Sequence, residues 1–239
     1  MAIVTAETRF LTATARVRAY LAASGATGAV AAAPETTEGS VVVDTLLTAT
    51  WAEVVIRHFA RQTNLLLSSS RVLVVGSGPL AAALTSRLGL MSASVSVASD
   101  SAVELLPFFI SGHSVLVGGS LVVGADIDVV IATGESHRPV APRAFERAVA
   151  RPIVLVDAGM PAAASAVDRA AFAESSVLGT RDDILGFGGD REGFLVTVSE
   201  TDDPAFERER LDVTTASSLM VGAVGVADAD RTLAEVLLS

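Results

Sequence analysis

Short, unbroken apolar runs alternate with stretches of helical periodicity through the middle of the chain. The apolar runs predict strands at 72–75, 94–98, 114–117, 129–132, 153–156 and 177–178. The intervening patterns predict helices at 79–88, 103–110, 143–149 and 168–173. Strands without polar alternation are buried on both faces, as in a parallel sheet covered by helices. The alternation therefore predicts an α/β fold with a Rossmann-type, doubly wound parallel sheet.

The two ends of the chain show a different pattern. Apolar spacing predicts helices at 5–24 and 44–67, the second as one helix or two, and a final helix at 217–238. A turn at 187–190 and a strand at 194–198 precede the final helix. We predict three segments: an N-terminal helical cap or dimerisation arm (1–68), a Rossmann domain (69–186) and a C-terminal strand–helix extension packing on the first segment (187–239).

A glycine-rich loop follows the first predicted strand directly. It comprises the residues Gly76, Ser77, Gly78, Pro79, Leu80 and Ala81. In a dinucleotide-binding loop the first glycine permits a tight turn and the second lets a pyrophosphate approach the backbone, while a small third residue allows close helix–sheet packing. The helix that follows presents its amides to the phosphates. The loop therefore predicts a dinucleotide site.

An acidic residue supports this interpretation and indicates which dinucleotide binds. Asp100 closes the second predicted strand, next to Ser99 and 24 residues after Gly76. A carboxylate there accepts hydrogen bonds from the ribose hydroxyls and repels a 2′-phosphate. No arginine follows Asp100 closely. We therefore expect NAD rather than NADP as the cofactor.

Two further turns lie at predicted strand ends. Ala132, Thr133 and Gly134 follow one strand, and Asp157, Ala158 and Gly159 follow the next. The carboxyl edge of a doubly wound sheet borders the bound ligand. We expect these turns to contact the nicotinamide side of the cofactor.

Few side chains suit catalysis at this predicted edge. His137, three residues beyond Gly134, is positioned to move a proton during hydride transfer, and an exposed histidine without a role is the alternative. Glu53 reaches the cleft only if the N-terminal arm folds over it, and a solvated helix carboxylate is the alternative. No His, Asp or Glu cluster has the spacing of a metal site, so we expect no metal.

The composition removes several classes of chemistry. The formal net charge of −10 disfavours nucleic acid and anionic membranes as partners. The sequence contains no cysteine and no lysine, which excludes thiol nucleophiles, thiolate metal sites and Schiff-base chemistry. No apolar run is long enough to span a membrane, and the start lacks a signal-peptide pattern, so we expect a cytoplasmic protein.

Residues of about 50–165 resemble the NAD domain of S-adenosylhomocysteine hydrolase. The likeness lies in Arg61-Gln62-Thr63-Asn64, in the Gly76 loop and in the turns at 132–134 and 156–159. It implies bound NAD and transient oxidation of the substrate. However, Met160 stands where the family has an active-site histidine, and the family's catalytic lysine and redox-site cysteine are absent. The standard hydrolysis is therefore not expected.

A second, weaker resemblance involves segments 136–140 and 151–157. They are similar to the cofactor domain of glutamyl-tRNA reductase and its shikimate-dehydrogenase-like relatives. That resemblance implies NADPH and, in the tRNA enzyme, a cysteine nucleophile, which this chain lacks.

These observations predict an NAD-binding oxidoreductase-type protein acting on a small polar metabolite. One alternative is a non-catalytic NAD-binding or scaffold protein derived from such an enzyme. The other is a reductase subunit whose site is completed by a partner or by a second copy. The apolar helices at 5–23 and 217–238 suit a homodimer, although packing within one chain explains them equally well.

Overall fold

The computed structural model describes residues 12–25, 39–63, 65–119, 121–135, 138–145, 152–160, 165–174, 184–187, 193–198 and 204–239. The chain forms two compact units, one of residues 1–50 with 204–239 and one of residues 51–203. Helix α2 (Val41–Thr63) contains the boundary between them. The predicted division into segments 1–68, 69–186 and 187–239 stays a prediction.

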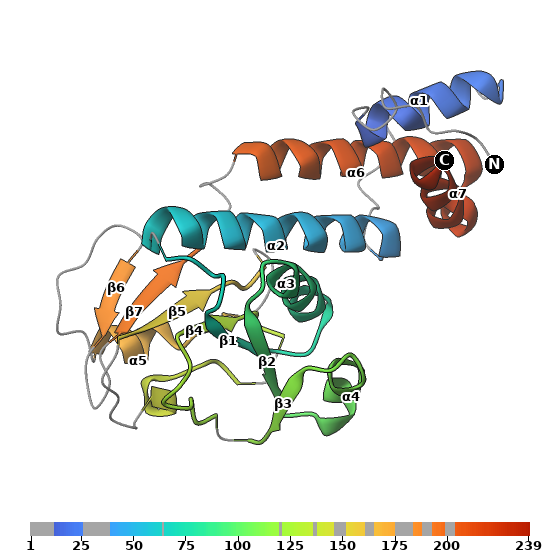
Figure 1. Cartoon of the computed structure of the whole chain (residues 1–239). Helices are drawn as coiled ribbons and strands as arrows, with labels where there is room; N and C mark the ends of the chain where they lie inside the picture. The colour runs from blue at the N-terminus through green and yellow to red at the C-terminus, as the bar shows by residue number, and fades with distance from the viewer. Residues whose placement is uncertain are drawn as a thin grey trace. The chain divides into compact units, whose positions relative to one another are not determined.

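The unit of residues 51–203 is built on a seven-stranded sheet in its described part (Figure 1). Its strands are β1 (Arg71–Val75), β2 (Ser94–Ser99), β3 (Ser114–Val117), β4 (Val129–Ala132), β5 (Ile153–Asp157), β6 (Ile184–Phe187) and β7 (Gly193–Thr197). The spatial order is β3-β2-β1-β4-β5-β7-β6, and every pairing is parallel except β6 with β7. This order confirms the predicted Rossmann-type α/β fold.

The strand register aligns the carboxyl ends of the central strands. Val75 of β1 lies opposite both Ala98 of β2 and Ala132 of β4, and Ala132 lies opposite Asp157 of β5. The turns that leave these strands therefore meet at one edge of the sheet. This is the edge where ligands bind in open α/β sheets.

Burial explains why these runs form strands. Every residue of β4 and β5 is buried, and so are four of the five residues of β1. Helix α3 (Pro79–Leu90) buries Leu80, Leu84 and Leu88, a four-residue spacing that lines one helix face. Helix α4 (Ala102–Ile110) follows β2 and begins at the capping residue Ser101.

An aromatic cluster fills one side of the sheet. It joins Phe145 of the 3₁₀ helix η2 (Pro142–Phe145), Phe172 of α5 (Arg169–Glu174) and Phe187 of β6. The ring centroids lie 4.9 to 6.1 Å apart in tilted or edge-on arrangements, which favour aromatic packing. This cluster anchors η2 and β6 to the core.

The other unit is helical. It contains α1 (Ala13–Ala23), α6 (Pro204–Val224), α7 (Val226–Leu238) and the first part of α2. Helix α1 contacts both α6 and α7, with Val17 and Leu21 in their shared core. The Asp212 carboxylate accepts hydrogen bonds from the amides of Ala13 and Thr14, at 2.7 and 3.2 Å, so α6 caps the start of α1. No helix of the described ranges is both long and apolar enough to cross a membrane.

Several predicted elements need correction. The final helix is two helices, because Gly225, at φ +81°, separates α6 from α7. The predicted turn at Phe187 is wrong, since this residue ends β6, and the predicted helix at 143–149 begins as the 3₁₀ helix η2. The second predicted helix ends at Thr63 rather than at 67. Residues 146–149 and 177–178 lie outside the described residues.

The pairing of β7 beside β5 and β6 depends on a glycine. A Cβ atom at Gly193 would overlap the Phe187 ring and lie 2.7 Å from the Ile153 carbonyl oxygen. We predict that Gly193→Ala lowers the free energy of unfolding by about 1–3 kcal/mol through overpacking. Gly89→Ala, in α3 with open space around it, is the matched control and is expected to stabilise by about 0.5 kcal/mol. Urea denaturation measures both, and equal effects at the two positions would contradict this packing.

Candidate functional site

The glycine loop is packed tightly against the turn after β4. Gly76 has φ +132°, and its amide donates a hydrogen bond of 2.8 Å to the Ala98 carbonyl. A Cβ atom at Gly76 would overlap the hydroxyl of Thr133. Only glycine fits this position, for its backbone conformation and for its lack of a side chain.

Glu135, a residue that the sequence did not single out, occupies the start of α3. Its two carboxylate oxygens accept hydrogen bonds from the amides of Leu80 and Ala81, each 2.8 Å long. A Cβ atom at Gly78 would lie 2.6 Å from the same carboxylate. An anion of the protein itself therefore lies on the amides that the glycine loop predicts for a pyrophosphate.

Two predicted cofactor residues, Ser77 and Ser99, meet at the edge of the sheet. Their hydroxyl oxygens are 2.9 Å apart, and Ser77 also bonds the Glu104 carboxylate. A carboxylate only accepts, so the single proton of Ser77 goes to Glu104 and Ser99 donates to Ser77. Ser99 also accepts from the Ser101 amide at 3.2 Å. The network ties the glycine loop to the end of β2.

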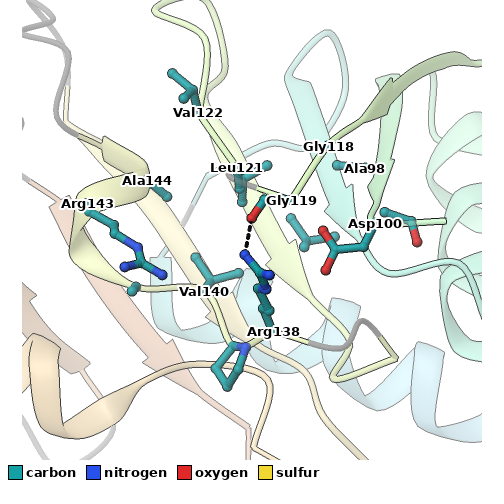
Figure 2. A pocket seen from close by; sticks show the side chains of 14 residues that line it. Ala98, Asp100, Gly118, Gly119, Leu121, Val122, Arg138, Val140, Arg143 and Ala144 are labelled. Atoms are coloured by element: carbon teal, nitrogen blue, oxygen red, sulfur yellow. Dashed lines mark hydrogen bonds between the residues drawn. The ribbon is translucent and has the colours of Figure 1, made fainter. Parts of the chain in front are cut away.

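A cavity of about 220 Å³ opens beside this network. Its charged lining residues are Asp100, Arg138 and Arg143. Figure 2 shows Asp100 and Arg138 reaching this cavity from different segments of the chain. The lining residues are Val75, Ala98, Ser99, Asp100, Gly118, Gly119, Leu121, Val122, Arg138, Pro139, Val140, Ala141, Arg143 and Ala144.

The two arginines change the argument about the cofactor's ribose. Arg138 donates a hydrogen bond of 2.6 Å to the Gly119 carbonyl and shares the cavity with Asp100. The sequence shows that no arginine directly follows Asp100, but the fold brings two arginines to the same cavity. Sequence adjacency alone is therefore not enough to exclude a 2′-phosphate.

The turn after β4 is held by internal hydrogen bonds. Thr133 is buried, and both its amide and its hydroxyl donate to the Val75 carbonyl, at 3.0 and 3.1 Å. The Thr133 hydroxyl also accepts from the Glu135 amide at 3.3 Å. Ala132 is buried within the sheet, and Gly134 takes a left-handed conformation at φ +75°.

The turn after β5 is held in the same way. Asp157 is 4% exposed, and one of its oxygens accepts from the Nε and Nη2 atoms of Arg169 at 2.8 and 2.6 Å. Ala158 accepts a hydrogen bond of 2.9 Å from the Trp51 indole and donates one of 2.9 Å to the Ala132 carbonyl. Gly159 follows without secondary structure. Both turns lie at the predicted edge, with their buried polar groups bonded within the protein.

The two predicted catalytic residues are not brought together. Glu53 forms an ion pair with Arg87 of α3, and its side chain is 47% exposed. At 1.5 Å per residue, Arg87 lies about 12 Å along α3 from its start, so this contact does not place Glu53 at the glycine loop. His137 lies outside the described residues. Across the described ranges, no group of His, Asp and Glu side chains is arranged to hold a metal ion.

No protein-family model matches this chain, and no curated protein matches it in sequence. Among solved structures, it is similar to a dipicolinate synthase chain from Bacillus subtilis, with a TM-score of 0.50, 14% identity and coverage of 82% of this chain and 56% of that one. The dipicolinate synthase chain from Bacillus halodurans gives 0.44, 14%, 82% and 57%, and an L-alanine dehydrogenase gives 0.49, 15%, 85% and 61%.

This chain spans less than two thirds of each of these proteins. At 14% identity, the likeness to the first of them shows a shared fold. It supports the Rossmann-type architecture that the strand order gives independently.

The buried ion pair of Asp157 indicates a structural role for this residue. We predict that Asp157→Asn lowers the free energy of unfolding by about 1–3 kcal/mol, because Arg169 loses its charged acceptor. The control is Asp126→Asn, which breaks an exposed ion pair with Arg71 and is expected to cost less than about 1 kcal/mol. Chemical denaturation of both variants tests this, and an unchanged stability of Asp157→Asn would contradict the structural role.

Proposed function

We propose that this protein binds NAD at the carboxyl edge of its sheet and is an oxidoreductase-type protein for a small polar metabolite. The observation that carries the proposal is the position of Asp100. It ends the β2 segment and lines the cavity, and its neighbour Ser99 is hydrogen-bonded to the glycine loop. A carboxylate at the end of the second strand, next to a glycine loop that opens a helix, is the arrangement that binds a dinucleotide.

Each part of NAD has candidate contacts in this proposal. The adenosine part lies in the cavity with its ribose hydroxyls on Asp100, and the pyrophosphate is bound by the amides of Leu80 and Ala81. The nicotinamide part lies toward the turns at 132–134 and 157–159. When bound, NAD supplies a hydride acceptor, and the protein supplies binding and orientation.

The resemblance to the NAD domain of S-adenosylhomocysteine hydrolase belongs to the same proposal. It favours transient oxidation of the substrate by tightly held NAD, without the hydrolysis typical of that family, since Met160 replaces the active-site histidine and lysine is absent. His137 is the proposed proton carrier. A homodimer and a cytoplasmic location remain predictions.

A non-catalytic NAD-binding protein is the second candidate, and a specific observation favours it. At the nicotinamide edge, Thr133 is bonded to Val75 and Asp157 to Arg169. These contacts stabilise the fold and provide no evident acid or base. Reduction of bound NAD by a hydroxy acid or nucleoside would support the enzyme, and binding without turnover across such a screen would support the second candidate.

We expect NAD to bind the purified protein and Asp100→Ala to bind it on the order of tenfold to a hundredfold more weakly. The loss of hydrogen bonds to a charged acceptor has this magnitude. Isothermal titration calorimetry, after removal of any cofactor retained through purification, measures both dissociation constants. Asp126→Ala removes an equal charge from an exposed ion pair and is the matched control.

The same variant tests the discrimination between NAD and NADP. Removing the carboxylate of Asp100 leaves Arg138 and Arg143 in the cavity, so the affinity for NADP relative to NAD should rise. No binding of either dinucleotide at millimolar concentration would refute the proposed function.

A further inference from the structure

We propose that Glu135 is an internal anion that closes the pyrophosphate site, so that a dinucleotide binds only after displacing this carboxylate. The proposal rests on the proposed function, because it describes the regulation of that same site. Its basis is the pair of 2.8 Å hydrogen bonds from the amides of Leu80 and Ala81 to the two oxygens of Glu135.

The carboxylate meets a need that α3 does not satisfy by itself. Pro79 is the first residue of α3 and has no amide hydrogen, and Gly78 provides no side-chain cap. The Ala82 amide already bonds the Gly78 carbonyl at 3.1 Å. The Leu80 and Ala81 amides are thus the unsatisfied donors of the first turn, and Glu135 accepts from both.

A pyrophosphate needs the same two donors. Phosphate groups bind at helix starts because amides point at their oxygens and the helix dipole favours negative charge. An amide hydrogen already directed at one anion is not available to another, and two anions in one place also repel each other. Binding of Glu135 and of a pyrophosphate is therefore mutually exclusive at these amides.

The position of Glu135 allows its carboxylate to leave without unfolding the turn. Its amide is fixed to the Thr133 hydroxyl at 3.3 Å, and Thr133 is itself bonded to Val75. Glu135 is only partly buried. Rotation of the side chain moves the carboxylate into solvent, while the backbone of the turn remains in place.

A ligand without phosphate provides the control for this mechanism. Adenosine fills the cavity beside Asp100 in the proposed binding mode and needs no amide of α3. Its affinity should not depend on Glu135. The affinity for NAD should increase when Glu135 loses its charge, because the binding-competent state then becomes more populated.

The experiment is calorimetric titration of the full chain, with NAD and with adenosine, for the wild type and for Glu135→Gln and Glu135→Ala. We expect both variants to bind NAD on the order of tenfold more tightly, and adenosine unchanged. Glu207→Gln removes one charge from an exposed i,i+3 pair of α6 and should alter neither affinity. Thermal melts verify folding and should show a larger NAD-induced rise in Tm for the Glu135 variants than for the wild type.

The outcomes separate this proposal from the proposed function. If the wild type binds NAD and the Glu135 variants bind it no more tightly, the closing role of Glu135 is wrong and NAD binding stands. An equal gain for adenosine would also overturn the proposal, because the effect would not be specific to the pyrophosphate. If no variant binds NAD, both proposals fail.

Discussion

The contact between Gly76 and Thr133 is the constraint on which the candidate site depends. No further carbon atom fits between the backbone of Gly76 and the hydroxyl of Thr133, and this hydroxyl is bonded to Val75. The end of β1 and the turn after β4 are consequently held together as one packed unit. Because α3 starts three residues after Gly76, the same contact brings Glu135 within hydrogen-bonding distance of the first amides of α3.

The start of α3 combines a structural requirement with a binding opportunity. A helix begins with amides that have no partner inside the helix, and a buried donor without an acceptor destabilises the protein. The site can satisfy these amides with its own carboxylate or with a bound anion. A cofactor-free protein therefore gains stability from the group that opposes cofactor binding, and the net affinity is the difference between the two interactions.

The fold was largely predictable because its signals are local. Strands β1, β4 and β5 are unbroken aliphatic runs, and such runs indicate burial on both faces whatever else surrounds them. The errors occur where a tertiary contact decides the structure. β6 contains Gly186, and its strand conformation depends on antiparallel pairing with β7. The charged start of α6 shows little apolar periodicity, and its helix is evident only from the packing against α1.

The candidate site divides along the same line. Gly76 and Asp100 could be predicted because a glycine loop and a strand-ending acid act through backbone conformation and position in the chain. Glu135 bonds an amide 55 residues away, and Arg138 reaches the cavity of Asp100 only after β4 has paired with β1. One signal did point to Glu135, since it directly follows a turn at the edge that the glycine loop shares. Acidic residues in the turns at that edge therefore need to be weighed as internal competitors for the phosphate site, as well as the glycines that form it.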